Sequence, residues 1–281
     1  KIVFDVDERC MLVPAHCWTP WFSVFGSMSG FDSLEECFEE YAPHIYAVET
    51  GLSSDPEMNW RVSQLDRIAL ISNSDSHSLK RIGREANVLD CKLSYSGIME
   101  AIKSHDPKQF LFTVEFFPEE GKYHYDGHRV CKFSCDPKQT KKLDNKCPHC
   151  DKPMTIGVMN RVDALADRAN GKKPNFAIPF KRMVPLDEII AESFGMTTAS
   201  KKVKIAYHGL VGAMGTEFGI LIDAKFSDLA NATTPEILEG IKRVREGKLY
   251  IEPGYDGEYG IVKIFQPHER IGKTAQASLF V

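Results

Sequence analysis

Short apolar runs recur along the first 120 residues, and polar side chains follow each of them. Runs of this length without internal alternation are typical of strands that are buried on both faces of a sheet. We expect four such strands, at residues 11–15, 45–49, 67–72 and 109–117. Because the reactive side chains of α/β proteins gather at the carboxyl ends of strands, the residues that follow these runs are candidates for a functional site.

Apolar residues at helical spacing alternate with these runs. In residues 33–41, Leu34 and Phe38 fall on one helical face, and Ser33 is a suitable N-cap. The same spacing predicts helices at residues 97–104, 154–169, 183–195 and 235–246. Residues 248–265 predict two short strands around a Pro-Gly turn. The alternation of strands and helices predicts an α/β protein.

Length and composition narrow the class of protein. The chain has 281 residues, of which 43% are hydrophobic and 26% charged, so it can bury a sizeable core and does not have the composition of a disordered chain. No run of about 18 apolar residues occurs, so we expect no membrane span. The chain begins with Lys1 rather than Met, inside a stretch with strand character, and we expect it to start partway into a domain.

The net charge of -4 conceals an uneven distribution of charge. Residues 121–205 contain 17 Lys and Arg against 9 Asp and Glu, whereas the rest of the chain contains 18 against 30. A basic segment on an acidic body predicts contact with a polyanion such as a nucleic acid. Lys-rich loops that only keep a small domain soluble are the alternative.

The eight cysteines fall into two groups. Four are scattered, which is typical of free thiols in a reducing compartment and indicates a cytoplasmic protein; these are Cys10, Cys17, Cys37 and Cys91. The other four form two close pairs, which can give four thiolates to one tetrahedral structural zinc ion. The simplest ligand set is Cys131, Cys135, Cys147 and Cys150. His124, His128 and His149 are near enough in the sequence to replace one of them.

Polar side chains at three predicted strand ends point to a second metal site. His16 and Glu49 follow the first two runs, and Asp75 and His77 follow the third. Imidazole and carboxylate groups bind divalent metals, which activate water and neutralise phosphate charge. Taken singly, each of these residues is more often a hydrogen-bonded structural residue.

Several segments together form a pattern that is more specific than any single motif. They are residues 14–23 (Pro-Ala-His-Cys-Trp-Thr-Pro-Trp-Phe-Ser), 30–33, 48–56, 74–77, 82–87, 184–192 and 252–260. The pattern resembles the endonuclease Q family of DNA repair nucleases, within the PHP (polymerase and histidinol phosphatase) superfamily. The resemblance implies an α/β fold, a distorted seven-stranded PHP-type β/α barrel whose N-terminal part is absent. A four-cysteine zinc-binding segment and a small α+β or helical C-terminal region would follow the barrel.

The resemblance also implies a division into domains. Those expected are residues 1–120 (the later part of a metal-dependent catalytic domain), 121–155 (zinc binding), 156–265 (helical or α+β, DNA binding) and 266–281 (a flexible tail). Within the tail, Gln276, Leu279 and Phe280 resemble the short motif by which bacterial proteins dock on the sliding clamp. An unstructured tail is the alternative.

PHP enzymes open with a His-x-His motif, and this chain has none near its start. Either those residues precede Lys1 in the native protein, or the chain lacks part of the metal cluster. The resemblance therefore gives metal-binding and catalytic roles to His16, Asp75 and His77, with Glu49 ranked lower because it can instead support the fold. It implies two or three divalent ions (Zn, Mn or Mg) that hydrolyse the DNA phosphodiester 5′ to a deaminated base such as uracil or hypoxanthine.

A lesion enzyme must extrude its target base and hold it against an apolar surface. Trp18, Trp21 and Phe22 follow His16 and are candidates for that surface, with ordinary core aromatics as the alternative. The cations expected at DNA phosphates are Lys80, Arg81, Arg84, Lys138, Lys141, Lys142 and Lys146. For the first three of these, a solvated helix face is the alternative. The implied partner is double-stranded DNA with a damaged base, and the implied location is the cytoplasm, at the nucleoid.

Two other functions fit part of the sequence. A PHP-type phosphatase acting on a small phosphorylated metabolite would explain His16, Asp75 and His77 but not the basic zinc segment. A non-catalytic zinc module that binds nucleic acid would explain the basic segment, and it is favoured if the chain truly starts at Lys1.

Overall fold

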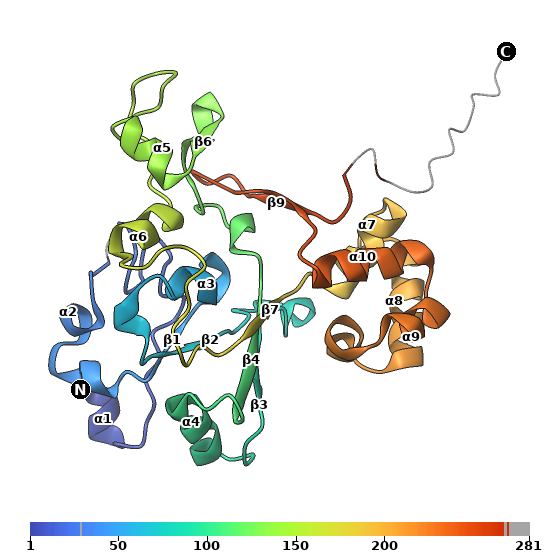
Figure 1. Cartoon of the computed structure of the whole chain (residues 1–281), viewed down its shortest axis with the longest axis horizontal. Helices are drawn as coiled ribbons and strands as arrows, with labels where there is room; N and C mark the ends of the chain where they lie inside the picture. Colours follow the sequence, from blue (N-terminus) through green and yellow to red (C-terminus); the bar gives the residue numbers. More distant parts are fainter. Residues whose placement is uncertain (29, 267–268, 270–281) are drawn as a thin grey trace. The chain divides into compact units, whose positions relative to one another are not determined.

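The chain divides into two units in the computed structural model, which describes residues 1–28, 30–266 and 269 (Figure 1). The first unit comprises Lys1–Lys181 and Glu252–Ile261, and the second comprises Arg182–Ile251 and the residues from Val262 onward. In the described part of the chain, none of the helices has the length and apolar character needed to cross a bilayer.

Two short parallel strands build the core of the first unit. β1 (Ala47–Glu49) pairs with β2 (Ala69–Ile71), and a parallel bridge from Leu12 to Ile45 places the preceding segment beside β1. Successive side chains of a strand point to opposite faces, so the two strands feed two apolar clusters. The first contains Val48, Leu70, Trp18, Phe25 and Val162, and the second contains Ala47, Ala69, Ile71, Ile102 and Phe110. This burial on both faces confirms the predicted strands at 45–49 and 67–72, whereas the run at 11–15 forms only the bridge at Leu12.

A three-stranded sheet lies next along the chain. β3 (Ala86–Leu89), β4 (Phe110–Glu115) and β7 (Phe180–Arg182) are hydrogen bonded in the order β3-β4-β7, and β3 runs antiparallel to β4. The helix α4 (Tyr95–Ser104) connects β3 to β4, and the Ser94 hydroxyl caps it. The predicted helix at 97–104 and strand at 109–117 are thus confirmed.

The ends of β1, β2 and β4 meet at one edge of the first unit. The Ser72 hydroxyl, just after β2, donates to the Val114 carbonyl at 2.8 Å. The Thr50 hydroxyl, just after β1, donates to the Glu115 carboxylate at 3.0 Å. We call this edge, where His16, Glu49 and the loop after β2 also lie, the carboxyl edge.

The first residues form a helix, so the strand character assigned to the beginning of the chain was wrong. α1 (Ile2–Val6) leaves Ile2 82% and Val6 79% exposed. A strand needs a neighbour to pair its backbone groups, whereas a helix pairs them locally. The other short helices of this unit are α2 (Leu34–Phe38), η1 (Glu39–His44), η2 (Gly51–Ser53), α3 (Pro56–Asn59), η3 (Ser63–Leu65), η4 (Leu79–Arg81) and η5 (Pro118–Glu120). Ser33 caps α2 as expected.

The zinc-binding segment is a hairpin followed by two helices. Its elements are β5 (Asp126–His128), η6 (Arg129–Cys131), β6 (Phe133–Cys135), α5 (Pro137–Lys142) and α6 (Val158–Leu165). Val158 and Val162 of α6 belong to the core of the first unit. The structure therefore divides the chain after Lys181 and not at the expected boundary between 155 and 156. The loop 252–261 returns to this segment, where Asp256 accepts hydrogen bonds from Arg129 and Thr155.

The second unit is helical. Its helices are α7 (Leu186–Phe194), α8 (Lys201–Met214), the π-helix η7 (Gly219–Asp223), α9 (Phe226–Ala232) and α10 (Pro235–Arg245), and a two-stranded ribbon of β8 (Tyr250–Glu252) and β9 (Ile261–Lys263) follows. α7 packs against both α8 and α10. The Arg245 guanidinium donates to the carbonyls of Ile220, Leu221 and Ala224, which satisfies backbone groups that the π-helix leaves open.

Candidate functional site

One histidine and three cysteines of the zinc-binding segment form a candidate metal site. The ligand atoms of His128, Cys131, Cys147 and Cys150 all lie within 4.8 Å of one another. The Sγ of Cys150 lies 3.5 Å from the Nδ1 of His128. Tetrahedral zinc with sulfur at about 2.3 Å and nitrogen at about 2.0 Å predicts an edge of about 3.6 Å between such ligands. The donor set and its spacing therefore fit one zinc ion.

Hydrogen bonds shift the pKa values of two of these thiols in opposite directions. The backbone N–H of Lys152 lowers the pKa of Cys150, and the Cys147 N–H donates to the Lys152 carbonyl at 2.8 Å, which closes the Cys-Pro-His-Cys turn. The hydrogen bond to Cys150 raises the pKa of Cys131 to about 11.

Cys135 lies outside this group of ligand atoms, although it packs in one cluster with Cys147 and Cys131, and the four-cysteine ligand set stays a prediction. In the antiparallel pairing of β5 and β6, Cys135 lies opposite Asp126, and Phe133 lies opposite His128. Cys135 is therefore two residues, or about 6.6 Å, further along β6 than the residue opposite His128. The thiol of Cys135 lies 3.2 Å from the Thr140 hydroxyl and is only 4% exposed. The sequence does contain a pattern that indicates His128 as a ligand. His128 and Cys131 have the same spacing as Cys147 and Cys150, with two residues between the members of each pair.

His16 is held at the carboxyl edge by Glu49. The His16 N–H donates to Glu49 Oε2 at 2.8 Å, and backbone bonds join Glu49 to Pro14 and Cys17. The backbone of His16 is left-handed, with φ of 31°. Gly51 passes so close that a Cβ there would lie 2.8 Å from the Cβ of His16, so only glycine fits.

The loop after β2 carries Asp75 and His77, both exposed. Asp75 is also left-handed, with φ of 46°. The Nδ1 of His77 lies 2.9 Å from the Asp75 carbonyl. Arg84 donates through Nε and Nη2 to the Ser74 carbonyl, at 3.2 and 3.0 Å. Arg84 therefore positions the loop beside Asp75, and its expected contact with DNA stays a prediction.

Glu49 connects this loop to His16. Its Oε1 accepts from the Asn73 side chain at 2.9 Å, while its Oε2 holds the His16 backbone. Asn73 is bonded in turn to Asn87, which pairs with the backbone of Ser72. Both oxygens of Glu49 accept hydrogen bonds from the protein, so Glu49 supports the two loops, and its lower-ranked role as a metal ligand stays a prediction.

Beyond the zinc-binding group, the described residues contain no other set of three His, Cys, Asp or Glu ligand atoms close enough to share an ion. His16, Asp75 and His77 are thus brought to one edge of the unit but not into direct chelating distance of one another. This edge contains two further carboxylates that sequence reasoning missed. Burial raises the pKa of Glu85 to about 9 and that of Glu115 to about 7. The signal for Glu115 was a charge inside the apolar run at 109–117.

The aromatic residues after His16 separate by burial. Trp18 is fully buried in the core, where its Nε1 donates to Asn59 at 2.7 Å, so its expected place at the lesion was wrong. Trp21 is 41% exposed and packs edge-on against Tyr123. Phe22 is 92% exposed with a left-handed φ of 56°, an uncommon conformation for a bulky residue.

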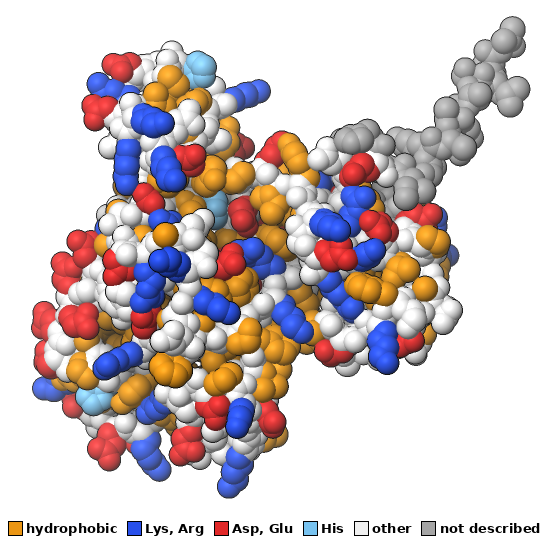
Figure 2. All heavy atoms as spheres, viewed as in Figure 1, with side chains coloured by type: hydrophobic (Ala, Val, Ile, Leu, Met, Phe, Trp, Pro, Cys, Tyr) orange, Lys and Arg blue, Asp and Glu red, His pale blue; other side chains and the backbone are white. Residues whose placement is uncertain are grey.

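The expected DNA-binding cations also differ in their surroundings. Lys80 and Arg81 are exposed on η4. Lys141 forms an ion pair with Asp163 at 2.8 Å, whereas Lys142 is exposed at the end of α5. Figure 2 shows Lys and Arg side chains, in blue, with some acidic ones on the lobe that carries α5. The clamp motif at Gln276, Leu279 and Phe280 lies outside the described residues.

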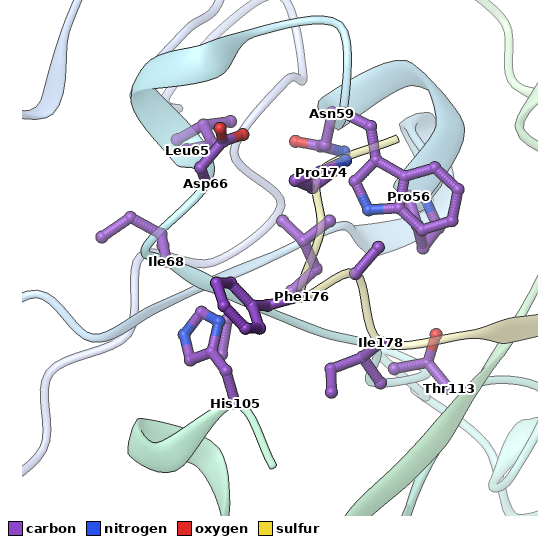
Figure 3. Close-up of a pocket in the computed structure, with 14 residues that line it drawn as sticks. Pro56, Asn59, Leu65, Asp66, Ile68, His105, Thr113, Pro174, Phe176 and Ile178 are labelled. Carbon is purple, nitrogen blue, oxygen red and sulfur yellow. The ribbon is translucent and has the colours of Figure 1, made fainter. Parts of the chain in front are cut away.

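A pocket opens elsewhere on the first unit (Figure 3). It lies at the amino end of β2, where Ile68, Leu70, His105 and Phe176 are among its lining residues. Burial lowers the pKa of His105. The pocket shares no lining residue with the group of His16, Asp75 and His77, so it is separate from the carboxyl edge.

The fold and the sites define a mixed α/β protein with a candidate metal site of one histidine and three cysteines. Two solved structures resemble it. Over 96% of the chain it matches the lesion-specific endonuclease PfuEndoQ from Pyrococcus furiosus, at TM-score 0.81 and 30% identity, covering 66% of that chain. Over 94% it matches an endonuclease Q in complex with a 27-mer duplex substrate with an abasic lesion at the active site, at TM-score 0.77 and 30% identity, again covering 66%. The chain belongs to the endonuclease Q family.

The curated relatives are two uncharacterized proteins. The chain is 32% identical over 262 residues to MJ0043 of Methanocaldococcus jannaschii, matching 90% of this chain and 32% of that protein. It is 32% identical over 259 residues to YqxK of Bacillus subtilis, matching 92% of this chain and 62% of that protein. The family model of the MJ0043 C-terminal domain matches residues 185–248, in the helical unit. The chain therefore spans about a third and about three-fifths of these relatives.

Proposed function

We propose that this chain is part of a DNA repair endonuclease that cleaves the phosphodiester 5′ to a deaminated base such as uracil or hypoxanthine. The observation that carries the proposal is the likeness to endonuclease Q structures along almost the whole chain, at 30% identity. The parallel pair of β1 and β2 supports a PHP-type β/α barrel, with His16 and the Asp75 loop at the carboxyl ends of its strands.

The donor types at the carboxyl edge are those that bind divalent metals, although three of their ligand atoms do not lie close together in the described residues there. His16 and His77 each place Nδ1 in a hydrogen bond, with the Thr19 hydroxyl at 3.1 Å and with the Asp75 carbonyl, which fixes each ring and leaves Nε2 as the ligand. His16, Asp75 and His77 would hold two or three ions of Zn, Mn or Mg. When bound, these ions supply hydroxide near neutral pH and neutralise charge on the phosphate. Glu49 would hold the loop of His16 and the loop of Asp75 and His77 in place relative to each other.

The exposed groups around this edge are the proposed DNA contacts. Phe22 offers a ring face to an extruded base, and Trp21 is partly exposed beside it in the sequence. Lys80 and Arg81 would bind phosphates beside the reacting one, and Lys142 would bind the backbone further along. The zinc site would hold the basic β5–β6 hairpin rigid for that contact.

Strand cleavage by the full-length protein tests the proposal. Labelled duplexes with uracil, hypoxanthine or normal bases are incubated with Mn, Mg or Zn and the wild type, Asp75→Asn, or Asp90→Asn as an exposed control. The expected result is a nick 5′ to the altered base that Asp75→Asn loses and Asp90→Asn keeps. Hydrolysis of a nucleotide or sugar phosphate without nicking would instead identify a phosphatase. DNA retention without hydrolysis would identify a binding module.

A further inference from the structure

The turn that follows His77 presents two large aliphatic side chains to water. Leu79 is 88% exposed and Ile82 is 67% exposed, and the two cations Lys80 and Arg81 stand between them in the sequence. Single exposed aliphatic residues are common on protein surfaces. Two of them that flank a pair of cations within four residues, beside a candidate catalytic loop, are a more specific arrangement.

The backbone of this turn is well supported. The Arg81 N–H donates to the Ser78 carbonyl at 3.0 Å, which closes η4. Arg84 then ties the following residues back to the Ser74 carbonyl, directly before Asp75. The exposed side chains therefore project from a framework that is fixed relative to Asp75.

We propose that Leu79 and Ile82 are a wedge that enters the base stack of duplex DNA beside the lesion, while Lys80 and Arg81 hold the flanking phosphates. This inference rests on the proposed function and adds the residues that open the duplex. Extruding a base leaves a gap in the stack, and aliphatic side chains fill such gaps in many proteins that bend or open DNA. An aliphatic wedge makes no hydrogen bond to a base edge, so it works at any neighbouring sequence.

The surroundings of these side chains favour DNA over a protein partner. A stable protein interface buries roughly 800 Å² on each partner and is depleted of charge at its centre. Here the apolar surface is two side chains wide, and cations stand next to each of them. Two cations flanked by aliphatic side chains can contact phosphates while the aliphatic side chains face the base stack.

Cleavage of paired and unpaired substrates by the full-length protein tests the wedge. Leu79→Ala, Ile82→Ala and their double variant are compared with the wild type on uracil in a matched duplex and on uracil in an unpaired bubble. Leu93→Ala is the control, because Leu93 is 95% exposed and lies beyond the opposite end of β3. The double variant loses part of the free energy that opens the base pair. We therefore expect its kcat/KM to fall about tenfold on the duplex and less than about twofold on the bubble, which is already open. Equal losses on both substrates, or no loss on either, would overturn the wedge.

A binding measurement separates the wedge from the cleavage reaction. A duplex with an abasic site and an adjacent 2-aminopurine is titrated without added Mn or Mg, and fluorescence reports unstacking. We expect the wild type and Leu93→Ala to brighten the probe, and the double variant to bind without brightening it. A wild type that binds without brightening the probe overturns the wedge, and one that brightens it but never nicks overturns the proposed function alone. A wild type that does not bind overturns both.

Discussion

Replacing His128 with alanine is expected to weaken zinc binding at the candidate metal site, whereas replacing Cys135 with alanine is expected to leave it unchanged. His128 lies with three thiols inside one group of ligand atoms, while Cys135 lies further along β6 against Thr140. Structural zinc contributes about 10–16 kcal/mol in small domains, so one ligand in four contributes about 3 kcal/mol. The His128 variant should therefore bind zinc about a hundredfold more weakly.

The Cys135 variant perturbs packing only. It removes one weak hydrogen bond and one buried sulfur atom, which together cost about 1–2 kcal/mol of the free energy of unfolding. Zinc content is measured by elemental analysis after dialysis against graded chelator, and unfolding is measured with urea. His149→Ala is the matched control, because His149 is exposed on the same turn but outside the group. Loss of zinc from the Cys135 variant together with full zinc in the His128 variant would refute the assignment.

Three further predictions concern the carboxyl edge and the tail. In Glu49→Gln, the new amide NH2 group faces either the His16 backbone N–H or the Asn73 side-chain amide, and both of these are donors. We therefore expect at least one of the two hydrogen bonds of Glu49 to be lost, and kcat to fall about tenfold with little change in KM. Burial raises the pKa of Glu85 to about 9, above the 4.5 of a free carboxyl, so the folded state keeps a proton that the unfolded state loses. The free energy of unfolding should therefore fall as pH rises from about 5 to 9, and Glu85→Gln should flatten this decline in urea titrations. Replacing Gln276 and Leu279 with alanine should abolish retention on an immobilised sliding clamp.

Each of these predictions has a contrary outcome. An unchanged kcat in Glu49→Gln would show that the contact with His16 is incidental. A wild-type stability that rises over the same pH window would contradict a protonated Glu85. Clamp retention that survives the tail substitutions would end the assignment of that motif.

Local patterns predicted most of the regular elements. The apolar runs at 45–49, 67–72 and 109–117 are β1, β2 and β4, and the helices predicted around 183–195 and 235–246 are α7 and α10. Such elements follow from side-chain periodicity, which is a property of neighbours in the sequence. α8 was not predicted, because Lys and Gly residues interrupt its apolar face. α1 was misread as a strand, because strand formation requires a partner that periodicity does not reveal.

The sequence by itself determined which residue types can do chemistry here and roughly where they lie: two metal-binding arms in a basic segment, and histidines and carboxylates after buried strands. The tertiary structure decided which of them meet. The register of β5 and β6 places His128 and not Cys135 in the metal group, and packing buries Trp18. Hydrogen bonds between distant segments make Arg84 and Glu49 hold the loops of the carboxyl edge in place. These outcomes depend on contacts between residues far apart in the chain, and no local pattern specifies such contacts.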